Sequence, residues 1–482
     1  MARAGSVETL HGGAPARSMR FSPSIVSGLI AGTDGLVVVG TGFVIYLLYI
    51  GWNAQTYPIY LAALAIQTVF VLTAFYLANL YKFETISRPA YQVKNILPIC
   101  SATFLVLVGM AFALKFSAHF SRVWFFSWLI SATLLICMER TCFYIILRRW
   151  SQTGWLTRNM VIVGAGEQGK KLLEHLDRVR EPWIRIVGIF DDRVDRIGPT
   201  VMGQPVLGTL DDLLGFAREH RIDDIIITLP WSADERLLGI INKLMELPVH
   251  VRLGSDLIGF MYPRGSSSFI GGVPMLDVVA EPLAGWKFVV KTLEDRILAA
   301  VMVILVAPLL LVIAVAIKLE SKGPVLFRQP RYGFNNKVFP VYKFRTMVHD
   351  RPPDQGVPQA RRNDPRATRV GAFLRRTSLD ELPQLFNVLH GTMSLVGPRP
   401  HPVFLNEEYA PIITGYFGRH RVKPGITGWA QVNGLRGETD TPDKMEDRVE
   451  YDIFYIENWS LLFDIQILAM TVYAVCSLKN AY

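Results

Sequence analysis

The sequence predicts a membrane α-helical bundle followed by two α/β domains, the second of which carries a further apolar helix. Apolar residues make up 51% of the 482 residues, a share that is high for a soluble protein. Long apolar stretches are concentrated in the first 150 residues, and strand-like and helix-like patterns alternate after them. This length allows two to four domains.

Four apolar stretches in the first part are each about long enough to span a bilayer as a helix. They are Ser24–Ile50, Tyr57–Leu80, Ile96–Phe116 and Val123–Leu147. Lysine and arginine follow the second and fourth stretches, whereas the first connection, GWNAQT, has no charge. By the positive-inside rule, both ends of this block are cytoplasmic. Residues 1–20 are therefore predicted to be a disordered tail and residues 21–150 a four-helix transmembrane domain. Asp34 within the first stretch is either a functional polar group or a residue that is hydrated or paired with another helix.

Residues 151–282 are predicted to form a Rossmann-like α/β domain with a linker. The segment NMVIVGAGEQGKKLLEHL places Gly164, Gly166 and Gly169 between an apolar strand and a helical pattern. Further alternation predicts a parallel sheet covered by helices. The three glycines either bind a nucleotide at the start of the helix or serve only tight packing, and both interpretations stay open. The Gly/Ser/Pro-rich stretch after residue 254 indicates a linker or an edge hairpin.

The third part, residues 283–482, begins with the uncharged stretch Ile297–Ile317. Its length fits a membrane crossing, and hydropathy alone predicts a fifth transmembrane helix. Pro308 lies near the middle of the stretch, however, where its ring removes a helix hydrogen bond and clashes with the preceding turn. A complete crossing would also place the rest of the chain on the opposite side of the membrane.

The chain is basic, and its positive charge is concentrated after this stretch. From Lys318 to Arg399 there are fifteen lysines and arginines against six acidic residues. A formal net charge of +9 favours anionic partners such as phosphorylated substrates or lipid headgroups. The four cysteines have no metal-ligand spacing, so neither zinc nor a disulfide is expected.

Asp380 and Glu381 form an adjacent carboxylate pair within this basic region. Such a pair among cations suits phosphoryl transfer, because one carboxylate can attack phosphorus while its neighbour holds a divalent cation. The cations predicted to bind phosphates are Lys343, Arg345, Arg375 and Arg376. The alternative is a capping box from Ser378 to Glu381, in which Glu381 only satisfies a backbone donor at a helix start. Pro383 argues against it, because as the fifth helical residue it would lack a needed N–H.

Several long motifs in the third part resemble those of a known family. They are YKFRTM, RRTSLDELPQLFNVLHGTMSLVGPRP, RHRVKPGITGWAQVNGLRGETDT and YDIFYIENWS. From about Lys287 to Tyr482 the chain is similar to the bacterial sugar transferase domain of monotopic phosphoglycosyl transferases. The preceding helices and Rossmann-like domain resemble the large members of that family. RGETDT and the closing NAY are most similar to the undecaprenyl-phosphate glucose phosphotransferases that initiate exopolysaccharides.

The resemblance implies a reaction and a set of site residues. Asp380 would attack the sugar-linked phosphate of a UDP-sugar and release UMP, and undecaprenyl phosphate would then collect the phosphosugar. Glu381 would bind Mg²⁺, and Pro398, Arg399 and Pro400 would shape the nucleotide pocket. Asp452 would be a supporting carboxylate. UDP-glucose is the expected donor, UDP-galactose is the alternative, and no nucleic-acid partner is expected.

The resemblance also implies how the third part meets the membrane. Because UDP-sugars are cytoplasmic, a helix over about residues 293–319 would enter the lipid, bend at Ala307 and Pro308 and return to the same face. The protein would be a multi-pass inner-membrane protein of a bacterium, with a mixed α/β, monotopic catalytic domain in the cytoplasm. A homodimer through the Rossmann-like domain is compatible with this architecture.

Two other functions fit parts of the sequence. An NAD-dependent nucleotide-sugar dehydratase would explain the Rossmann-like domain, but that class needs a Tyr-x-x-x-Lys pair, which this sequence lacks. A membrane scaffold with relic motifs is disfavoured because all the motif residues are present.

Overall fold

The computed structural model describes residues 22–86, 88–152, 157–179, 183–229, 234–254, 267–270, 273–348, 366–413, 415–435 and 441–476. The predicted tail of residues 1–20, most of the motif RGETDT and the closing NAY lie outside these ranges. The chain folds as two compact units that divide between Thr157 and Arg158.

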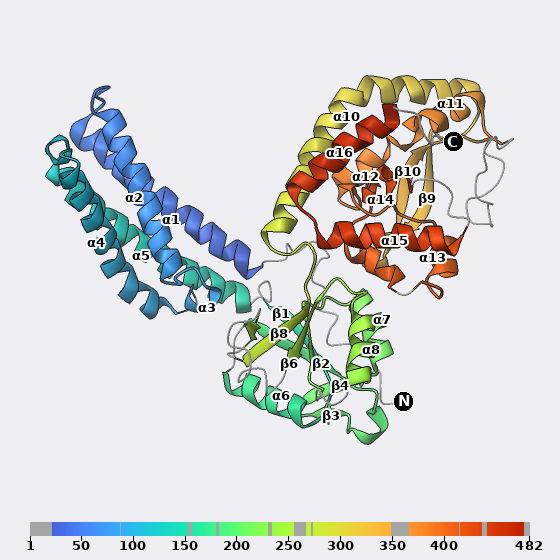
Figure 1. Cartoon of the computed structure of the whole chain (residues 1–482), viewed down its shortest axis with the longest axis horizontal. Helices are drawn as coiled ribbons and strands as arrows, with labels where there is room; N and C mark the ends of the chain where they lie inside the picture. The colour runs from blue at the N-terminus through green and yellow to red at the C-terminus, as the bar shows by residue number, and fades with distance from the viewer. Residues whose placement is uncertain are drawn as a thin grey trace. The chain divides into compact units, whose positions relative to one another are not determined.

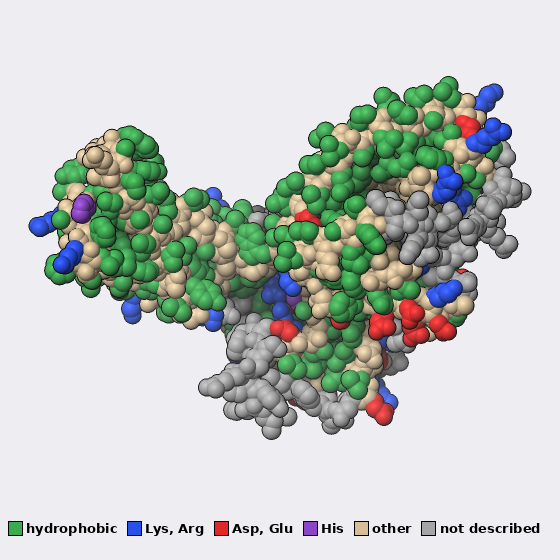
Figure 2. Space-filling view, turned by 45° about the horizontal axis from the view of Figure 1, so that its top comes forward, with side chains coloured by type: hydrophobic (Ala, Val, Ile, Leu, Met, Phe, Trp, Pro, Cys, Tyr) green, Lys and Arg blue, Asp and Glu red, His purple; other side chains and the backbone are tan. Residues whose placement is uncertain are grey.

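The first unit is a bundle of apolar helices (Figure 1). Its long helices are α1 (Pro23–Ile45), which continues as a π-helical turn (Tyr46–Ile50), α2 (Tyr57–Leu77), α4 (Pro89–Ala113) and α5 (Arg122–Gln152). The connections contain α3 (Phe83–Ile86) and a 3₁₀ turn (Ser117–His119). Each long helix is long and apolar enough to cross a membrane, which confirms the four predicted stretches. Hydrophobic side chains cover most of the visible surface of this unit (Figure 2), as a lipid environment requires.

Asp34 is paired with another helix, which is one of the predicted alternatives. Its Oδ2 atom lies 2.5 Å from Nη2 of Arg140 on α5 and accepts a 2.8 Å hydrogen bond from the Tyr81 hydroxyl. Both charged side chains are buried, with relative exposures of 0% and 2%. Pairing of this kind is what allows ionised groups to persist inside an apolar bundle.

The second unit begins with an α/β fold on an eight-stranded sheet in the order β3-β4-β2-β1-β5-β6-β8-β7. The strands are β1 (Arg158–Val163), β2 (Ile184–Phe190), β3 (Thr200–Val201), β4 (Gln204–Gly208), β5 (Asp224–Ile227), β6 (His250–Gly254), β7 (Ser267–Ile270) and β8 (Val273–Val279). The helices are α6 (Glu167–Val179), α7 (Leu210–Glu219) and α8 (Asp234–Leu244). The central strands β4, β2, β1, β5 and β6 are parallel, as predicted, and the edges are antiparallel. The segment after residue 254 was predicted to be a linker or an edge hairpin. Its described part contains the antiparallel hairpin β7–β8, which confirms the second alternative.

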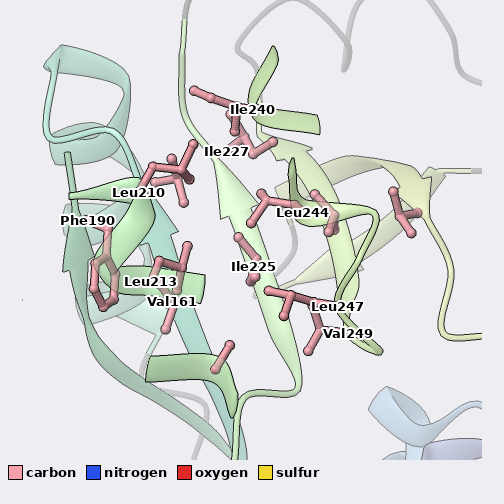
Figure 3. Close-up of a cluster of buried hydrophobic side chains, with 14 of the residues drawn as sticks. Val161, Phe190, Leu210, Leu213, Ile225, Ile227, Ile240, Leu244, Leu247 and Val249 are labelled. Atoms are coloured by element: carbon pink, nitrogen blue, oxygen red, sulfur yellow. The ribbon is translucent and has the colours of Figure 1, made fainter. Parts of the chain in front are cut away.

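Alternate side chains of the central strands face opposite helix layers. Val161 on β1 and Ile225 on β5 pack with α7 and α8 in the cluster shown in Figure 3. Met160 and Ile162 of β1, with Ile226 of β5, pack against α6 on the other face. A parallel sheet buried on both faces requires such continuous apolar strands.

The remainder of the second unit is a mixed α/β fold around helix α10 (Trp286–Glu320). Its strands form two pairs, the antiparallel β9 (Leu326–Tyr332) with β10 (Val338–Phe344) and the parallel β11 (Ser394–Val396) with β12 (Gly425–Thr427). The helices are α11 (Arg369–Thr377), α12 (Gln384–His390), α13 (Val403–Tyr409), α14 (Trp429–Val432), α15 (Pro442–Glu457) and α16 (Leu461–Cys476). Three 3₁₀ turns in the described part of this fold span Phe334–Asn336, Leu379–Glu381 and Tyr416–Arg421. The core contains Ala299 of α10, Val341 of β10, Leu385 of α12 and Ile467 of α16.

Helix α10 is continuous and contains Pro308, one residue after Ala307. It changes direction along its length (Figure 1), as expected where a proline interrupts helix hydrogen bonds. Its buried side chains lie in two stretches, from Lys291 to Ala299 and from Ile313 to Ile317. The middle between them exposes apolar side chains such as Ile304 and Leu305, each 73% exposed. An apolar surface of this kind fits lipid. The helix is long and apolar enough to span a bilayer, and the predicted return to the same face stays a prediction.

Candidate active site

The predicted carboxylate pair lies in a tight turn between two short helices. Helix α11 ends at Thr377 and is followed by Ser378, whose φ of 58° is left-handed. A 3₁₀ turn then carries Asp380 and Glu381, and α12 follows after Pro383. The side chain of Ser378 makes no capping hydrogen bond at this turn, so the capping-box alternative is wrong. The turn therefore presents two neighbouring carboxylates that are not needed to start a helix.

Glu381 is held by two cations from different elements. Its Oε1 atom lies 2.8 Å from Nζ of Lys343 on β10 and 2.7 Å from Nη2 of Arg399. Nη1 of Arg399 also reaches Oε2 at 3.3 Å, which makes this contact a bidentate pair. Burial alone would raise the pKa of Glu381, but Arg399 and Lys343 hold that pKa well below its usual range. Glu381 is therefore ionised at neutral pH.

Asp380 differs from its neighbour, because it forms no ion pair within the part of the chain that the structure describes. Burial raises the pKa of Asp380 to about 6, and the negative charge of Glu381 acts in the same direction. Lys343, Arg399 and Arg375 oppose this rise. A carboxyl group with this pKa is mostly ionised at pH 7, and its oxygens are free to attack an electrophile.

The segment that carries Arg399 is packed tightly against a second backbone segment. β11 leads directly into Gly397, Pro398, Arg399 and Pro400, of which the two prolines are buried. A Cβ atom on Gly397 would lie 2.6 Å from the carbonyl oxygen of Lys423, so the two backbones approach too closely for any side chain. The predicted motif thus has a packing role in addition to supplying the arginine that binds Glu381.

Two further arginines hold the same segment and were not identified from the sequence. Nη2 of Arg419 donates a 2.8 Å hydrogen bond to the carbonyl oxygen of Arg399, and Nη1 of Arg331 donates to that of Pro400. Asp452, the predicted supporting carboxylate, lies 2.6 Å from Nη2 of Arg419 in a fully buried pair. Arg419 is the first residue of the motif RHRVKPG. The sequence alone does not distinguish its role from those of the neighbouring cations Arg421 and Lys423.

Arg331 also faces the cations of the site. Burial lowers the pKa of Arg331 to about 10, and the positive charge of Arg399 contributes to the decrease. Arg331 lies on β9, and β10 beside it carries Lys343. The hairpin β9–β10 therefore supplies two of the positive groups around Glu381.

Two of the predicted phosphate-binding residues lie elsewhere. Nη1 and Nη2 of Arg345 each donate a 2.8 Å hydrogen bond to a backbone carbonyl, of Lys322 and Ser321 respectively, at the C-terminal end of α10. This geometry gives Arg345 a helix-capping role. Arg376 on α11 has an exposed side chain and makes no ion pair with the two carboxylates in the described residues. The structure thus brings together Asp380, Glu381, Lys343, Arg375 and Arg399 and leaves Arg345 and Arg376 outside this group.

The glycines of the Rossmann-like domain have structural roles at two of the three positions. Gly164 has a φ of 110°, which side chains rarely adopt. A Cβ atom on Gly169 would lie 2.3 Å from the carbonyl oxygen of Gly164, so the helix needs glycine to pack on the strand. Gly166 is not constrained in this way, because its Cβ would meet only Arg193 at 4.0 Å. Nucleotide binding by this domain stays a prediction.

The donor groups at the carboxylate pair fit Mg²⁺ in chemical type. Asp380 and Glu381 offer hard oxygen ligands, and no group of three or more potential metal-binding side chains converges anywhere in the described ranges. Mg²⁺ is commonly held by one or two carboxylates together with substrate phosphates and water. Asp380 and Glu381 would hold such an ion together with the phosphate oxygens of a bound substrate.

Comparison with known families gives two matches that divide the chain. The family model described as bacterial sugar transferase matches residues 286–478, which include every residue of the carboxylate site. A second model, described as CoA-binding domain, matches residues 77–254. The second match covers α4, α5 and the sheet up to β6.

Similar proteins have been named in several bacteria. A UDP-glucose:undecaprenyl-phosphate glucose-1-phosphate transferase of Xanthomonas campestris pv. campestris is 35% identical over 93% of both chains. A protein of the same name from Escherichia coli (strain K12) is 41% identical over 75% of this chain and 76% of its own. A UDP-N-acetylgalactosamine-undecaprenyl-phosphate N-acetylgalactosaminephosphotransferase of Aeromonas hydrophila is 46% identical over 36% of this chain and 41% of its own.

Proposed function

Because the chain belongs to the bacterial sugar transferase family, we propose that it transfers glucose 1-phosphate from UDP-glucose to undecaprenyl phosphate and releases UMP. The observation that carries this proposal is the carboxylate of Asp380, which forms no ion pair with any described residue and lies next to Glu381, which Lys343 and Arg399 hold in place. The names of relatives that match nearly the whole chain supply the two substrates. Family membership also disfavours the dehydratase and scaffold alternatives.

In the first half of the proposed reaction, an oxygen of Asp380 attacks the phosphorus that carries the sugar. A bond forms between this oxygen and phosphorus, and the bond from phosphorus to the bridging oxygen of the diphosphate breaks. UMP leaves with the bridging oxygen, and the sugar phosphate stays on Asp380 as an acyl phosphate. Lys343, Arg375 and Arg399 lie close enough to influence the charge of Asp380, so they also suit the stabilisation of the departing phosphate.

In the second half, an oxygen of undecaprenyl phosphate attacks the same phosphorus. The bond to Asp380 breaks, the free carboxylate is restored, and a polyprenyl diphosphate sugar is released. The two steps use the same cations, because each passes through a phosphorus centre that carries extra negative charge. When bound through Glu381, Mg²⁺ would neutralise the phosphate oxygens of the donor.

The proposal includes the membrane arrangement of the site. We place the protein in the bacterial inner membrane with its catalytic fold in the cytoplasm, where UDP-sugars are found. The apolar, exposed middle of α10 and the exposed apolar side chains of α16, such as Leu462 and Tyr473, would contact lipid. This would bring the site to the level of the headgroups, where the phosphate of the lipid substrate lies.

A galactose-type donor is the second candidate, because the Aeromonas relative named for N-acetylgalactosamine phosphate transfer matches within the same family. The test uses the full-length protein in lipid nanodiscs with undecaprenyl phosphate and Mg²⁺. UMP release is measured with UDP-glucose, UDP-galactose and UDP-N-acetylgalactosamine in parallel. Fastest turnover with UDP-glucose supports the proposal, and a preference for either other donor reassigns the sugar.

The role of Asp380 is tested by Asp380→Asn, which keeps the shape of the side chain and removes the nucleophile. We expect no measurable turnover and an unchanged thermal unfolding midpoint. The exposed Asp447 on α15 provides the control Asp447→Asn, which should retain full activity. Mass spectrometry of the wild-type protein with donor alone should show a hexose-phosphate adduct on Asp380. Normal turnover in Asp380→Asn would exclude the nucleophilic role.

A further inference from the structure

A buried cluster of charged side chains lies at the N-terminal part of α10, and the proposed reaction gives it no role. Nζ of Lys291 lies 2.5 Å from Oδ2 of Asp464 on α16 and 3.1 Å from Oδ1 of Asp295. The exposed fractions of these three residues are 5%, 0% and 5%. Buried charges are unfavourable unless they are paired and hydrogen-bonded. Such a cluster at the start of an otherwise apolar helix therefore requires an explanation beyond packing.

Asp295 connects this cluster to the strand that leads to Arg399. Its Oδ1 atom accepts hydrogen bonds of 2.9 Å from the backbone N–H of Leu395 and from the hydroxyl of Ser394. Both residues belong to the three-residue strand β11, which ends three residues before Arg399. A single carboxylate oxygen of Asp295 thus accepts one backbone and one side-chain hydrogen bond from strand β11.

The far end of β11 is attached to the same cluster. The hydroxyl of Tyr455 lies 2.9 Å from Oδ1 of Asp464 and 3.0 Å from the carbonyl oxygen of Val396, the last residue of the strand. Nε1 of Trp459 donates a 3.0 Å hydrogen bond to Oδ2 of Asp464. The strand is therefore fixed at both ends to charges that are anchored on α10 and α16.

The C-terminal end of α10 is attached to the segment that carries the other cation of the site, Lys343. Arg345, directly after β10, donates to the backbone carbonyls of Ser321 and Lys322, the two residues that follow the helix. Lys343, which contacts Glu381, lies two residues before Arg345. One part of α10 is therefore hydrogen-bonded to the segment that leads to Arg399, and its C-terminal end to the segment that carries Lys343. Both of these cations contact Glu381.

We propose that Asp295 is a positioning residue that places Arg399 against Glu381 through strand β11. This inference rests on the proposed function. A displaced cation stabilises the transition state less well, and a misplacement of about 1 Å can lower the rate on the order of 100-fold. Removal of Asp295 should therefore lower kcat more than it changes KM for the donor.

The test compares Asp295→Ala, which removes both hydrogen bonds, with Asp295→Asn, which keeps an acceptor at the same place. In the full-length protein in nanodiscs, we expect Asp295→Ala to lower kcat about 10- to 100-fold with KM within about twofold of wild type. Asp295→Asn should recover part of this loss. Asp447→Ala, at an exposed position on α15, is the control and should leave both constants unchanged.

A double-mutant cycle with Arg399→Ala separates positioning from a general loss of stability. If Asp295 acts through Arg399, Asp295→Ala should have little further effect on kcat in the Arg399→Ala background. An equal loss in both backgrounds, or a wild-type kcat for Asp295→Ala, overturns the inference.

A second measurement does not depend on turnover. Hydrogen–deuterium exchange of peptides that cover residues 394–403 should be faster in Asp295→Ala than in wild type, and unchanged exchange there also overturns the inference. If the wild-type protein releases no UMP from any donor, the proposed function fails, and the exchange measurement still decides whether Asp295 holds this segment.

Discussion

The ion pair formed by Asp452 and Arg419 near the candidate site is deeply buried, with exposed side-chain fractions of 3% and 0%. Burial raises the pKa of Asp452, and Arg419 opposes that rise by favouring the charged form. Arg419 also donates to the backbone of Arg399. The pair therefore links the interior of the fold to the arginine that holds Glu381.

Replacement of Asp452 by asparagine should destabilise the protein strongly. The change leaves the guanidinium of Arg419 buried without its counter-charge, which typically costs about 3–5 kcal/mol. We expect a lower thermal unfolding midpoint in detergent and slower UMP release. Asp447→Asn on the same helix is exposed and should shift the midpoint little. A midpoint for Asp452→Asn equal to that of the control would show that Arg419 finds another partner.

Gly397 gives a second prediction at the residue scale. In Gly397→Ala the new methyl group would lie 2.6 Å from a backbone oxygen, so the segment before Arg399 must move. Forced overpacking of this kind typically costs about 1–3 kcal/mol. We expect reduced kcat and a lower unfolding midpoint. Gly418→Ala is the matched control, because its methyl group would meet only side-chain atoms of Ile453 at 3.8 Å.

The sequence identified the residues whose chemistry is unusual and missed those whose role depends on three-dimensional neighbours. Asp380 and Glu381 stood out because they are adjacent carboxylates within a strongly basic region. Arg345 was predicted to bind phosphate on the same compositional ground, yet it caps α10. The role of Arg331 could not be predicted, because the carbonyl that it contacts lies 69 positions away in the chain.

At the scale of elements, hydropathy predicted the long helices well, because a long apolar run forms a membrane-spanning helix largely independently of the rest of the chain. The boundaries were less accurate where polar residues extend a helix. Helix α4 begins at Pro89 rather than Ile96, since Gln92 is buried and its Nε2 atom donates to the carbonyl oxygen of Leu80. The central parallel strands followed from their continuous apolar runs. The antiparallel edges depend on pairing between segments that the alternating pattern alone does not specify.

The pairing of α1 with α5 through Asp34 and Arg140 gives a prediction for the helical bundle. Asp34→Ala should lower the thermal unfolding midpoint in detergent, because Arg140 would stay buried without a counter-charge, at a cost of about 3–5 kcal/mol. Replacement of both residues, as in Asp34→Leu with Arg140→Met, should recover much of this loss, since apolar pairs of similar volume often replace buried ion pairs without penalty. A double variant no more stable than Asp34→Ala would contradict this explanation.

At the scale of the whole molecule, the decisive question is the side of the membrane on which each connection lies. If the first four long helices cross the membrane and α10 returns to the side from which it enters, the loop after α1 lies in the periplasm. The segment after α10 then lies in the cytoplasm. In a variant without the native Cys100, Cys137, Cys142 and Cys476, a membrane-impermeant thiol reagent reports these positions. Lys322→Cys should react only from the cytoplasm, and Ala54→Cys only from the periplasm; both residues are exposed.

Pro308 provides the internal test of this arrangement. Pro308→Ala restores a backbone N–H and removes the clash with the preceding turn, so α10 can straighten over a length sufficient to cross the bilayer. We expect part of the Lys322→Cys population to become reactive from the periplasm in this background, with a matching loss of UMP release. Pro98→Ala in α4 is the control, because that proline lies inside a helix already expected to cross. Reaction of Lys322→Cys from the periplasm with Pro308 intact would instead make α10 a complete crossing and place the carboxylate pair away from any cytoplasmic donor.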